Sequence, residues 1–240
     1  SRKITTNYQI FDPGFYRYGN SDWVYHNWWK AGHKDVNPRK AIILSNDTFF
    51  YHLSVLLGID QISDMLSHWG FGNKTFIDIP GENIGLIPSR EWKENRGETW
   101  LVGDTIITGI GQGAMLATPL QIVHALSTLA NQGKGFTPHV LVSQEHPSGK
   151  VDHHVPQPLP PVKLDPKLWN YVVEAMGEVT TSGTGRRFGA FSWPVAAKTG
   201  TAQVARHSGK DKKYAKKLQD HTMFALFTPT KNPEVALIVL

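Results

Sequence analysis

The sequence contains no cysteine at all. This absence excludes disulfide bonds and metal sites built on thiolate ligands, although it says little about the cellular compartment. No apolar run approaches the roughly 18 residues that a helix needs to cross a bilayer, and residues 1–6 lack the plan of a signal peptide. The chain begins without methionine and stops inside an apolar run, so we expect both ends to continue into a longer protein.

What is present indicates a globular protein. Hydrophobic residues make up 40% of the 240 positions, and eight tryptophans are among them. A chain of this length and composition can bury one sizeable core or two small ones.

The formal charge of +5 is concentrated in one segment between Val204 and His221. Its charged residues are Arg206, Lys210, Lys212, Lys213, Lys216 and Lys217 against Asp211 and Asp220. We favour a solvated hairpin insertion over a contact surface for an anionic partner such as lipid headgroups or wall polymer. The run does not alternate with aromatic side chains, so nucleic-acid binding is not expected.

Helix signals begin after residues 1–36, a stretch rich in aromatics, Gly and Asn that we interpret as irregular and partly buried. Asn37 as cap and Pro38 as first residue predict a helix that ends at Ser45. Asp47 is expected to cap a second helix, which Gly58 ends.

Ser45-Asn46-Asp47 therefore falls at a junction between two helices. Such a junction can point short polar side chains into a cleft while apolar neighbours hold the backbone, which suits a catalytic hydroxyl. The plain alternative is that Ser45 and Asp47 only satisfy the free amides of the second helix. A third helix, capped by Asp60, is expected to follow and to end at Gly70.

The middle of the chain combines a loose, Gly-rich stretch with a helix that we interpret as scaffold. Residues 71–113 end in Gly109-Ile-Gly-Gln-Gly113, which lacks the Gly-Lys-Ser/Thr ending of a phosphate loop, so nucleotide binding is not expected. Thr118-Pro-Leu-Gln121 is a capping box that opens a helix to Gly133.

The last third combines a surface connection, a helix and a sheet. Residues 147–161 are rich in Pro and His, and we interpret His153-His154 as a solvated pair because no third metal ligand has a sensible spacing. Asp165-Pro166 opens a helix. Three strands are expected, at 195–204, 222–228 and 235–240. With a helical part at about 37–186, this order predicts an α+β fold with an antiparallel sheet.

Lys198-Thr199-Gly200-Thr201 lies in the first of these strands, which we interpret as an edge strand. Gly200 removes side-chain cover from the backbone, so a carboxylate substrate can lie along the strand beside the lysine. The alternative for such a short motif is a solvated lysine on an ordinary strand.

Taken together, the motifs resemble the transpeptidase domain of class B penicillin-binding proteins over nearly the whole chain. The residues that carry the likeness are Ser45-x-Asp47, Gly111-Gln-Gly113 before Thr118-Pro-Leu-Gln121, and Lys198-Thr-Gly-Thr-Ala-Gln-Val204. Phe11-Asp-Pro-Gly14, the Trp-rich stretch to His33 and Asp47-Thr-Phe-Phe-Tyr51 narrow it to the elongation-specific penicillin-binding protein 2 subfamily of Gram-negative bacteria.

The resemblance implies a serine D,D-transpeptidase that cross-links peptidoglycan stem peptides through an acyl-enzyme and is acylated by β-lactams. It implies that Ser45 belongs to the proton relay to the leaving group. It also implies that Asp47 has an orienting role at the third corner of the site, the other two corners being Ser45 and Lys198. Lys198 would be the electrostatic partner of Ser45 and of the substrate carboxylate. Thr199 and Thr201, on either side of Gly200, would bind that carboxylate, and the Thr201 N–H would form half of the oxyanion hole.

The same resemblance implies the cellular setting. It places the protein at the periplasmic face of the inner membrane, held by an N-terminal anchor that is absent from this chain. The implied partners are the glycosyltransferase and scaffold proteins of the elongation complex, and no cofactor is implied.

One departure from the family concerns the nucleophile. The Ser-x-x-Lys tetrad that carries it does not occur in these 240 residues. We expect the nucleophile helix and the first strands to precede Ser1 and the closing helix to follow Leu240. The fold would then be incomplete at both ends, and the chain alone inactive.

A second departure concerns a metal. Some relatives are similar to metal proteins in this region, with two aspartates, a histidine and a cysteine. Asp12 and His33 match, but Asn27 and Asn46 stand where a carboxylate and the cysteine would be. Amides are poor ligands, so no metal is expected, with His26 as the residue that could substitute.

Other functional classes stay open at this point. A serine β-lactamase shares the Lys-Thr-Gly strand but needs a base for its hydrolytic water, and no matching acidic loop is present. A penicillin-recognising sensor would bind the drug without acting on wall peptides. A purely structural partner of the elongation complex would form no covalent adduct.

Overall fold

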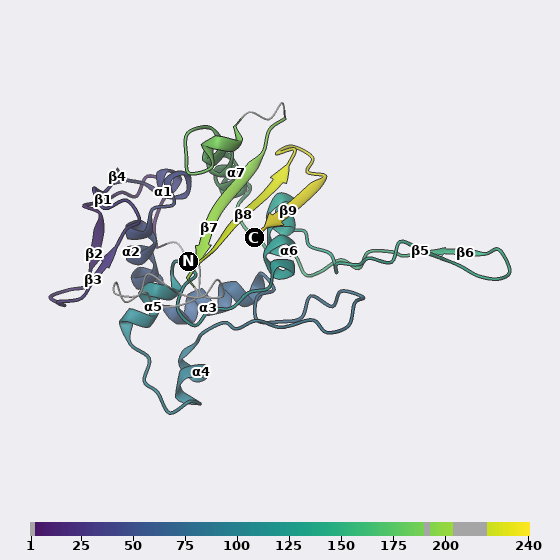
Figure 1. Ribbon diagram of the computed structural model, residues 1–240, viewed down its shortest axis with the longest axis horizontal. Coiled ribbons are helices and arrows are strands. Elements are labelled where there is room, and N and C mark those ends of the chain that lie inside the picture. The colour runs from purple at the N-terminus through teal and green to yellow at the C-terminus, as the bar shows by residue number, and fades with distance from the viewer. Residues whose placement is uncertain (1–2, 190–192, 204–219) are drawn as a thin grey trace.

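The computed structural model describes residues 3–189, 193–203 and 220–240. A mostly helical part lies beside a three-stranded antiparallel sheet formed by the C-terminal residues (Figure 1). The expected α+β fold is confirmed. Most of the basic segment after Val204 lies outside the described residues.

The sheet consists of β7 (Ala196–Ala202), β8 (His221–Thr228) and β9 (Val235–Val239), in that spatial order. Both pairings are antiparallel, with Lys198 opposite Ala225 and Phe227 opposite Ala236. Since β7 pairs only with β8 in the described sheet, the strand that carries Lys198 is an edge strand, as the sequence predicts.

One face of this sheet packs against two long helices, α6 (Pro119–Ala130) and α7 (Pro166–Thr181). Leu126 and Met176 from the helices meet Ala196 and Phe227 from the strands in one buried cluster. Both helices begin as predicted, α6 at the Thr118 capping box and α7 at the Asp165 cap. The cluster fixes the position of β7 relative to the helical part.

The helical part begins with three consecutive helices: α1 (Pro38–Leu44), α2 (Asp47–Leu57) and α3 (Ile59–His68). The turn between α1 and α2 and the start of α2 line the cleft opposite β7. The predicted start of α1 is confirmed, because the Asn37 side chain accepts the N–H of Lys40 at 2.9 Å. The breaks between the helices also fall where the sequence predicts them.

The predicted caps of α2 and α3 are wrong by one or two residues. Asn46, not Asp47, caps α2, since its Oδ1 accepts the N–H of Phe49 at 2.7 Å. Asp60 lies in the first turn of α3, whose cap is Gly58 with φ of 78°. Asn and Asp are comparable caps, and a carboxylate in the first turn also favours the helix dipole, so the pattern alone does not separate the two positions.

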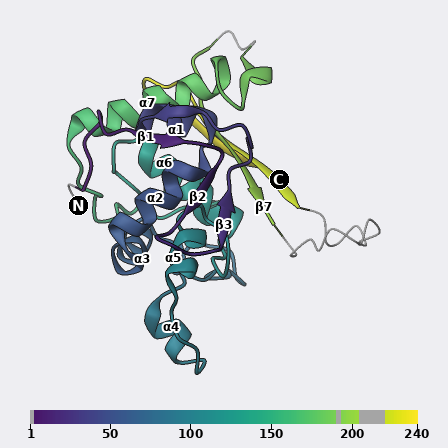
Figure 2. The same cartoon turned by 90° about the vertical axis from the view of Figure 1, so that its left-hand side faces the viewer.

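The first 36 residues are more regular than the sequence suggests. β1 (Ile10–Asp12) pairs with β4 (Lys34–Val36), and β2 (Phe15–Arg17) pairs with β3 (Val24–His26). These two ribbons lie over α1 and α2 (Figure 2). Strands of three residues are too short to show an alternating pattern, which explains why irregular structure was expected.

The loops of the middle region contain small elements. They hold α4 (Arg90–Glu94) and α5 (Val102–Thr108), and the hairpin of β5 (Ser143–Glu145) and β6 (Val151–His153) extends away from the body (Figure 1). His154, of the expected solvated pair, packs against His139 with ring centroids 4.1 Å apart and ring planes tilted by 33°. A short 3-10 helix, η1 (Arg186–Phe188), follows α7. No helix within the described ranges is both long and apolar enough to cross a membrane.

A first prediction concerns the contact between α1 and the end of α7. A Cβ on Gly183 would lie 2.2 Å from the Ile43 carbonyl oxygen and 2.9 Å from Val179 Cα. We expect Gly183→Ala to lower the free energy of unfolding by about 1–3 kcal/mol through overpacking. Urea denaturation followed by circular dichroism measures this change.

Gly177 within α7 provides the matched control. Its added Cβ would meet only Val195 O, at 3.9 Å. Gly177→Ala should therefore be neutral or stabilise the helix by up to about 1 kcal/mol. Equal losses in both variants would contradict a specific contact at Gly183.

Candidate active site

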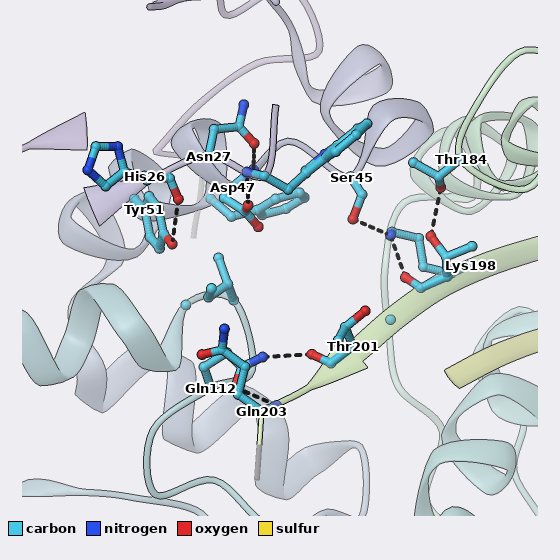
Figure 3. Close-up of a pocket in the computed structure, with 16 residues that line it drawn as sticks. His26, Asn27, Ser45, Asp47, Tyr51, Gln112, Thr184, Lys198, Thr201 and Gln203 are labelled. Atoms are coloured by element: carbon cyan, nitrogen blue, oxygen red, sulfur yellow. Dashed lines mark hydrogen bonds between the residues drawn. The ribbon is translucent and has the colours of Figure 1, made fainter. Parts of the chain in front are cut away.

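Ser45 occupies the sharp turn between α1 and α2. Its backbone is left-handed, with φ 51° and ψ 52°, and Asn46 N continues the turn by donating to Ala41 O at 2.9 Å. A non-glycine residue is strained in this region, and such strain is common at functional sites. The turn places the Ser45 side chain in the cleft between the helical part and the sheet (Figure 3).

Lys198 reaches the same cleft from β7. Its Nζ donates to Ser45 Oγ at 2.8 Å and to the carbonyl of Thr199 at 2.8 Å. Burial lowers the pKa of Lys198 to about 8, and the nearby carboxylate of Asp47 limits that decrease. The ammonium is thus poised to release a proton near neutral pH while still attracting anions.

Asp47 is the first residue of α2 and lies half-buried beside Ser45. Its Oδ2 accepts the backbone N–H of Trp28 at 3.0 Å, and the Trp28 indole donates to Leu44 O at 3.0 Å. Burial raises the pKa of the Asp47 carboxyl, while the Trp28 N–H and the charge of Lys198 act in the opposite direction. Trp28 therefore spans the Ser45–Asp47 junction from outside.

All six site residues expected from the sequence line a single cleft of about 760 Å³. They are Ser45, Asp47, Lys198, Thr199, Gly200 and Thr201. Tyr51, which the sequence marks only as part of a subfamily motif, lines it as well and donates to the carbonyl of His26 at 3.4 Å. Burial raises the pKa of Tyr51, so it stays a hydroxyl donor.

Gln112 closes the cleft opposite Ser45 (Figure 3). Its Nε2 donates to Thr201 O at 2.6 Å, and its Oε1 accepts the N–H of Gln203 at 3.4 Å. The Gly111-Gln-Gly113 motif marks this residue as part of the family likeness, but the sequence assigns it no role, because its partner on β7 is 89 residues away. Thr184 was also missed; its hydroxyl lies 2.7 Å from that of Thr199.

These contacts define where the backbone of β7 points. The carbonyls of Thr199 and Thr201 bind Lys198 and Gln112, outside the pairing with β8. In an antiparallel strand the N–H and C=O of one residue point to the same side. The N–H of Thr201 is therefore directed away from β8 and into the cleft, where it can donate to an oxyanion.

A buried polar cluster lies behind the turn between α1 and α2. It consists of Asp12, Asn27, His33 and Asn46, and we call it the Asp12 hub. Asp12 Oδ2 accepts hydrogen bonds from Asn46 Nδ2 at 2.6 Å, Asn27 Nδ2 at 2.8 Å and His33 N at 2.9 Å. Oδ1 accepts the N–H of Gly14 at 2.8 Å. Burial alone would raise the pKa of Asp12, but the hydrogen bonds from its surroundings hold it below its usual range.

The Asp12 hub contains the four positions compared above with a metal site, at which no metal is expected from the sequence. Both asparagines turn their NH₂ groups toward Asp12, so the centre is lined by hydrogen-bond donors that a cation would repel. His26, the substitute ligand, is exposed, and none of the hydrogen bonds to Asp12 comes from it. No group of three or more His, Cys, Asp and Glu side chains within the described ranges could hold a metal ion.

Known proteins are similar to this chain over nearly its whole length. The family model described as "Penicillin binding protein transpeptidase domain" matches residues 1–240. The chain is 38% identical to peptidoglycan D,D-transpeptidase MrdA of Acinetobacter baumannii, covering 96% of this chain and 35% of that protein. It is 36% identical to MrdA of Escherichia coli K12, covering 99% of this chain and 39% of that protein. The chain thus spans little more than a third of these relatives.

Solved structures of penicillin-binding proteins are also similar to this chain. The crystal structure of Pseudomonas aeruginosa PBP2 in complex with WCK 5153 matches with a TM-score of 0.85 and 39% identity, over 99% of this chain and 49% of that one. Penicillin-binding protein PBP2 from Helicobacter pylori matches with a TM-score of 0.80 and 32% identity, over 98% and 41%.

A second prediction concerns the ionisation of Lys198. With a pKa of about 8, roughly a tenth of its side chains are neutral at pH 7. The rate at which acetic anhydride modifies Lys198 should rise through this range, as read by peptide mass spectrometry with exposed Lys167 as an internal reference. Asp47→Asn should move the rise to lower pH, because it removes the carboxylate that favours the ammonium. A rise centred near pH 10.5 would contradict the burial of the amine.

Proposed function

Because the chain belongs to the penicillin-binding-protein transpeptidase family, and within it to the MrdA (PBP2) branch, we propose that it forms the substrate-binding part of a peptidoglycan D,D-transpeptidase. The observation that carries this proposal is the hydrogen bond between Lys198 Nζ and Ser45 Oγ, with Asp47 beside it in one cleft. A buried lysine bound to a hydroxyl is suited to proton transfer and to holding a carboxylate.

The substrate is a stem peptide that ends in D-Ala-D-Ala. Its terminal carboxylate lies against the Lys198 ammonium and the hydroxyls of Thr199 and Thr201, at the open edge of β7. Gly200 leaves the strand uncovered between them, so the peptide can approach the backbone. Binding of the carboxylate fixes the scissile carbonyl over the Thr201 N–H.

The reaction has two steps, the formation of an acyl-enzyme and the transfer of its acyl group to an amine. The serine of the family's Ser-x-x-Lys motif, which these 240 residues do not contain, attacks the carbonyl carbon and passes its proton to its paired lysine. Ser45 relays a proton to the leaving nitrogen, the C–N bond breaks and D-alanine departs. An amine from a neighbouring stem peptide then attacks the ester carbonyl, the C–O bond to the serine breaks, and the proton given up by the amine returns to the serine oxygen. The new amide bond is the cross-link.

Within this scheme the remaining residues position the reactants. Asp47 has the orienting role beside Ser45 and Lys198, and its carboxylate limits the decrease in the pKa of Lys198. The N–H of Thr201 stabilises the negative charge that develops on the carbonyl oxygen. β-Lactams are expected to acylate the same nucleophile, since their carboxylate and strained amide resemble the terminus of the stem peptide.

The setting is proposed from relatives. One matching structure is described as a complex between PBP2 and MreC from Helicobacter pylori, and another concerns a peptidoglycan synthase complex that coordinates polymerization and crosslinking. By analogy, the protein works at the periplasmic face of the inner membrane, held by an N-terminal anchor, beside a scaffold protein and a glycosyltransferase.

A third prediction tests the role of Lys198. In the full-length protein, benzylpenicillin should add one covalent adduct, seen by intact mass spectrometry. Lys198→Ala should slow this acylation by about 10²–10⁴-fold, because it removes the partner of Ser45 and of the drug's carboxylate, while the melting temperature is retained. Lys167→Ala, an exposed lysine on α7, should leave the rate unchanged.

The same experiment separates the alternatives. A stable adduct together with cross-linking of stem peptides supports the transpeptidase, whereas rapid loss of the adduct would indicate a β-lactamase. A stable adduct with no activity on stem peptides would indicate a sensor. If a folded full-length protein formed no adduct, the protein would be a non-catalytic partner.

A fourth prediction concerns Gln112 as a positioning residue. Gln112→Ala removes the support of Thr201 O, so the Thr201 N–H loses its fixed direction. We expect acylation to slow about tenfold, the effect of one lost hydrogen bond of about 1.4 kcal/mol. Gln144→Ala, on the exposed strand β5, is the control, and an unchanged rate in Gln112→Ala would contradict this role.

A further inference from the structure

The Asp12 hub contains four side chains that converge on one point, with Asp12 1%, Asn27 2% and Asn46 0% exposed. His33 Nδ1 lies 3.2 Å from Asp12 Oδ2 and 2.9 Å from Asn46 Nδ2, so the imidazole completes the cluster. The hub is therefore a built polar centre inside the protein wall.

The outward ends of the two amides determine what the hub does. Asn46 Oδ1 caps α2 by accepting the N–H of Phe49 at 2.7 Å, and Asn27 Oδ1 accepts the N–H of Asp47 at 3.3 Å. Only oxygen can accept these backbone donors, which fixes both NH₂ groups toward Asp12. Each amide thus transmits the position of the buried carboxylate to the start of α2, next to Ser45.

A cation could enter only if both amides turned over to present oxygen. That rotation would leave the N–H groups of Phe49 and Asp47 without their acceptors and would turn two NH₂ groups away from the Asp12 carboxylate. The donor set consequently favours the hydrogen-bonded arrangement over metal ligation, which requires lone pairs directed at the ion.

We propose that the amides of Asn27 and Asn46 replace metal ligands in this chain, so that the Asp12 hub holds the Ser45–Asp47 junction without a metal ion. Two substitutions should then convert it into a metal site. Asn27→Asp and Asn46→Cys would supply a second carboxylate and a thiolate beside Asp12 and His33, a ligand set of the kind that Zn²⁺ binds.

The test measures metal content and thermal stability of the full-length protein after incubation with Zn²⁺ and dialysis. The wild type should retain no Zn²⁺ at this site, and its melting temperature should move by less than about 1 °C with either Zn²⁺ or a chelator. The double variant Asn27→Asp/Asn46→Cys should retain one equivalent and gain more than about 3 °C with Zn²⁺. Asn170→Asp/Asn131→Cys, at two exposed asparagines, is the matched control and should gain neither.

Either of two results would overturn the proposal. The first is one equivalent of Zn²⁺ in the wild type that is lost with stability on chelation. The second is a folded double variant that binds no Zn²⁺. If the double variant does not fold, Asn46→Cys alone can be titrated with Co²⁺, where a thiolate-to-cobalt absorption band supports the proposal and its absence in the folded variant opposes it. These measurements need no substrate, so their outcome does not depend on the proposed transpeptidase activity.

Discussion

The hydrogen bond between Lys198 and Ser45 joins the two walls of the cleft, and the site depends on it. Its partners are 153 residues apart, one on the edge strand of the sheet and one in the turn between α1 and α2. A contact of 2.8 Å requires both elements to be held to within a fraction of an ångström. The rest of the structure can be understood by how it supplies that precision.

Each side of the contact has its own support. Behind the sheet, Leu126 and Met176 pack against Ala196 and fix β7 to the helices. Behind the turn, the buried Asp12 carboxylate holds the two asparagine amides that bind the first turn of α2. Polar groups serve this purpose well in a buried wall, because hydrogen bonds specify direction as well as distance, and four of them converge on the Asp12 carboxylate.

The electrostatics of the cleft follow from the same arrangement. Lys198 loses hydration by burial, and Asp47 and two oxygen acceptors compensate in part. Asp47 is itself favoured as a carboxylate by the N–H of Trp28 and by Lys198. A mostly buried cation with an adjacent carboxylate keeps its affinity for anions and still has a pKa close to neutral, which suits both substrate binding and proton transfer.

The sequence by itself determined the elements whose signals are local. Helix starts at Asn37, Thr118 and Asp165 depend on hydrogen bonds within four residues, and short local patterns of apolar residues indicate the three C-terminal strands. The motifs around Ser45 and Lys198 were visible for the same reason. The tertiary structure alone decided the cap of α2, the three-residue strands before α1 and the reach of Gln112 to Thr201. The convergence on Asp12 joins residues up to 34 positions apart, and such contacts depend on how elements pack, which no local pattern of residues records.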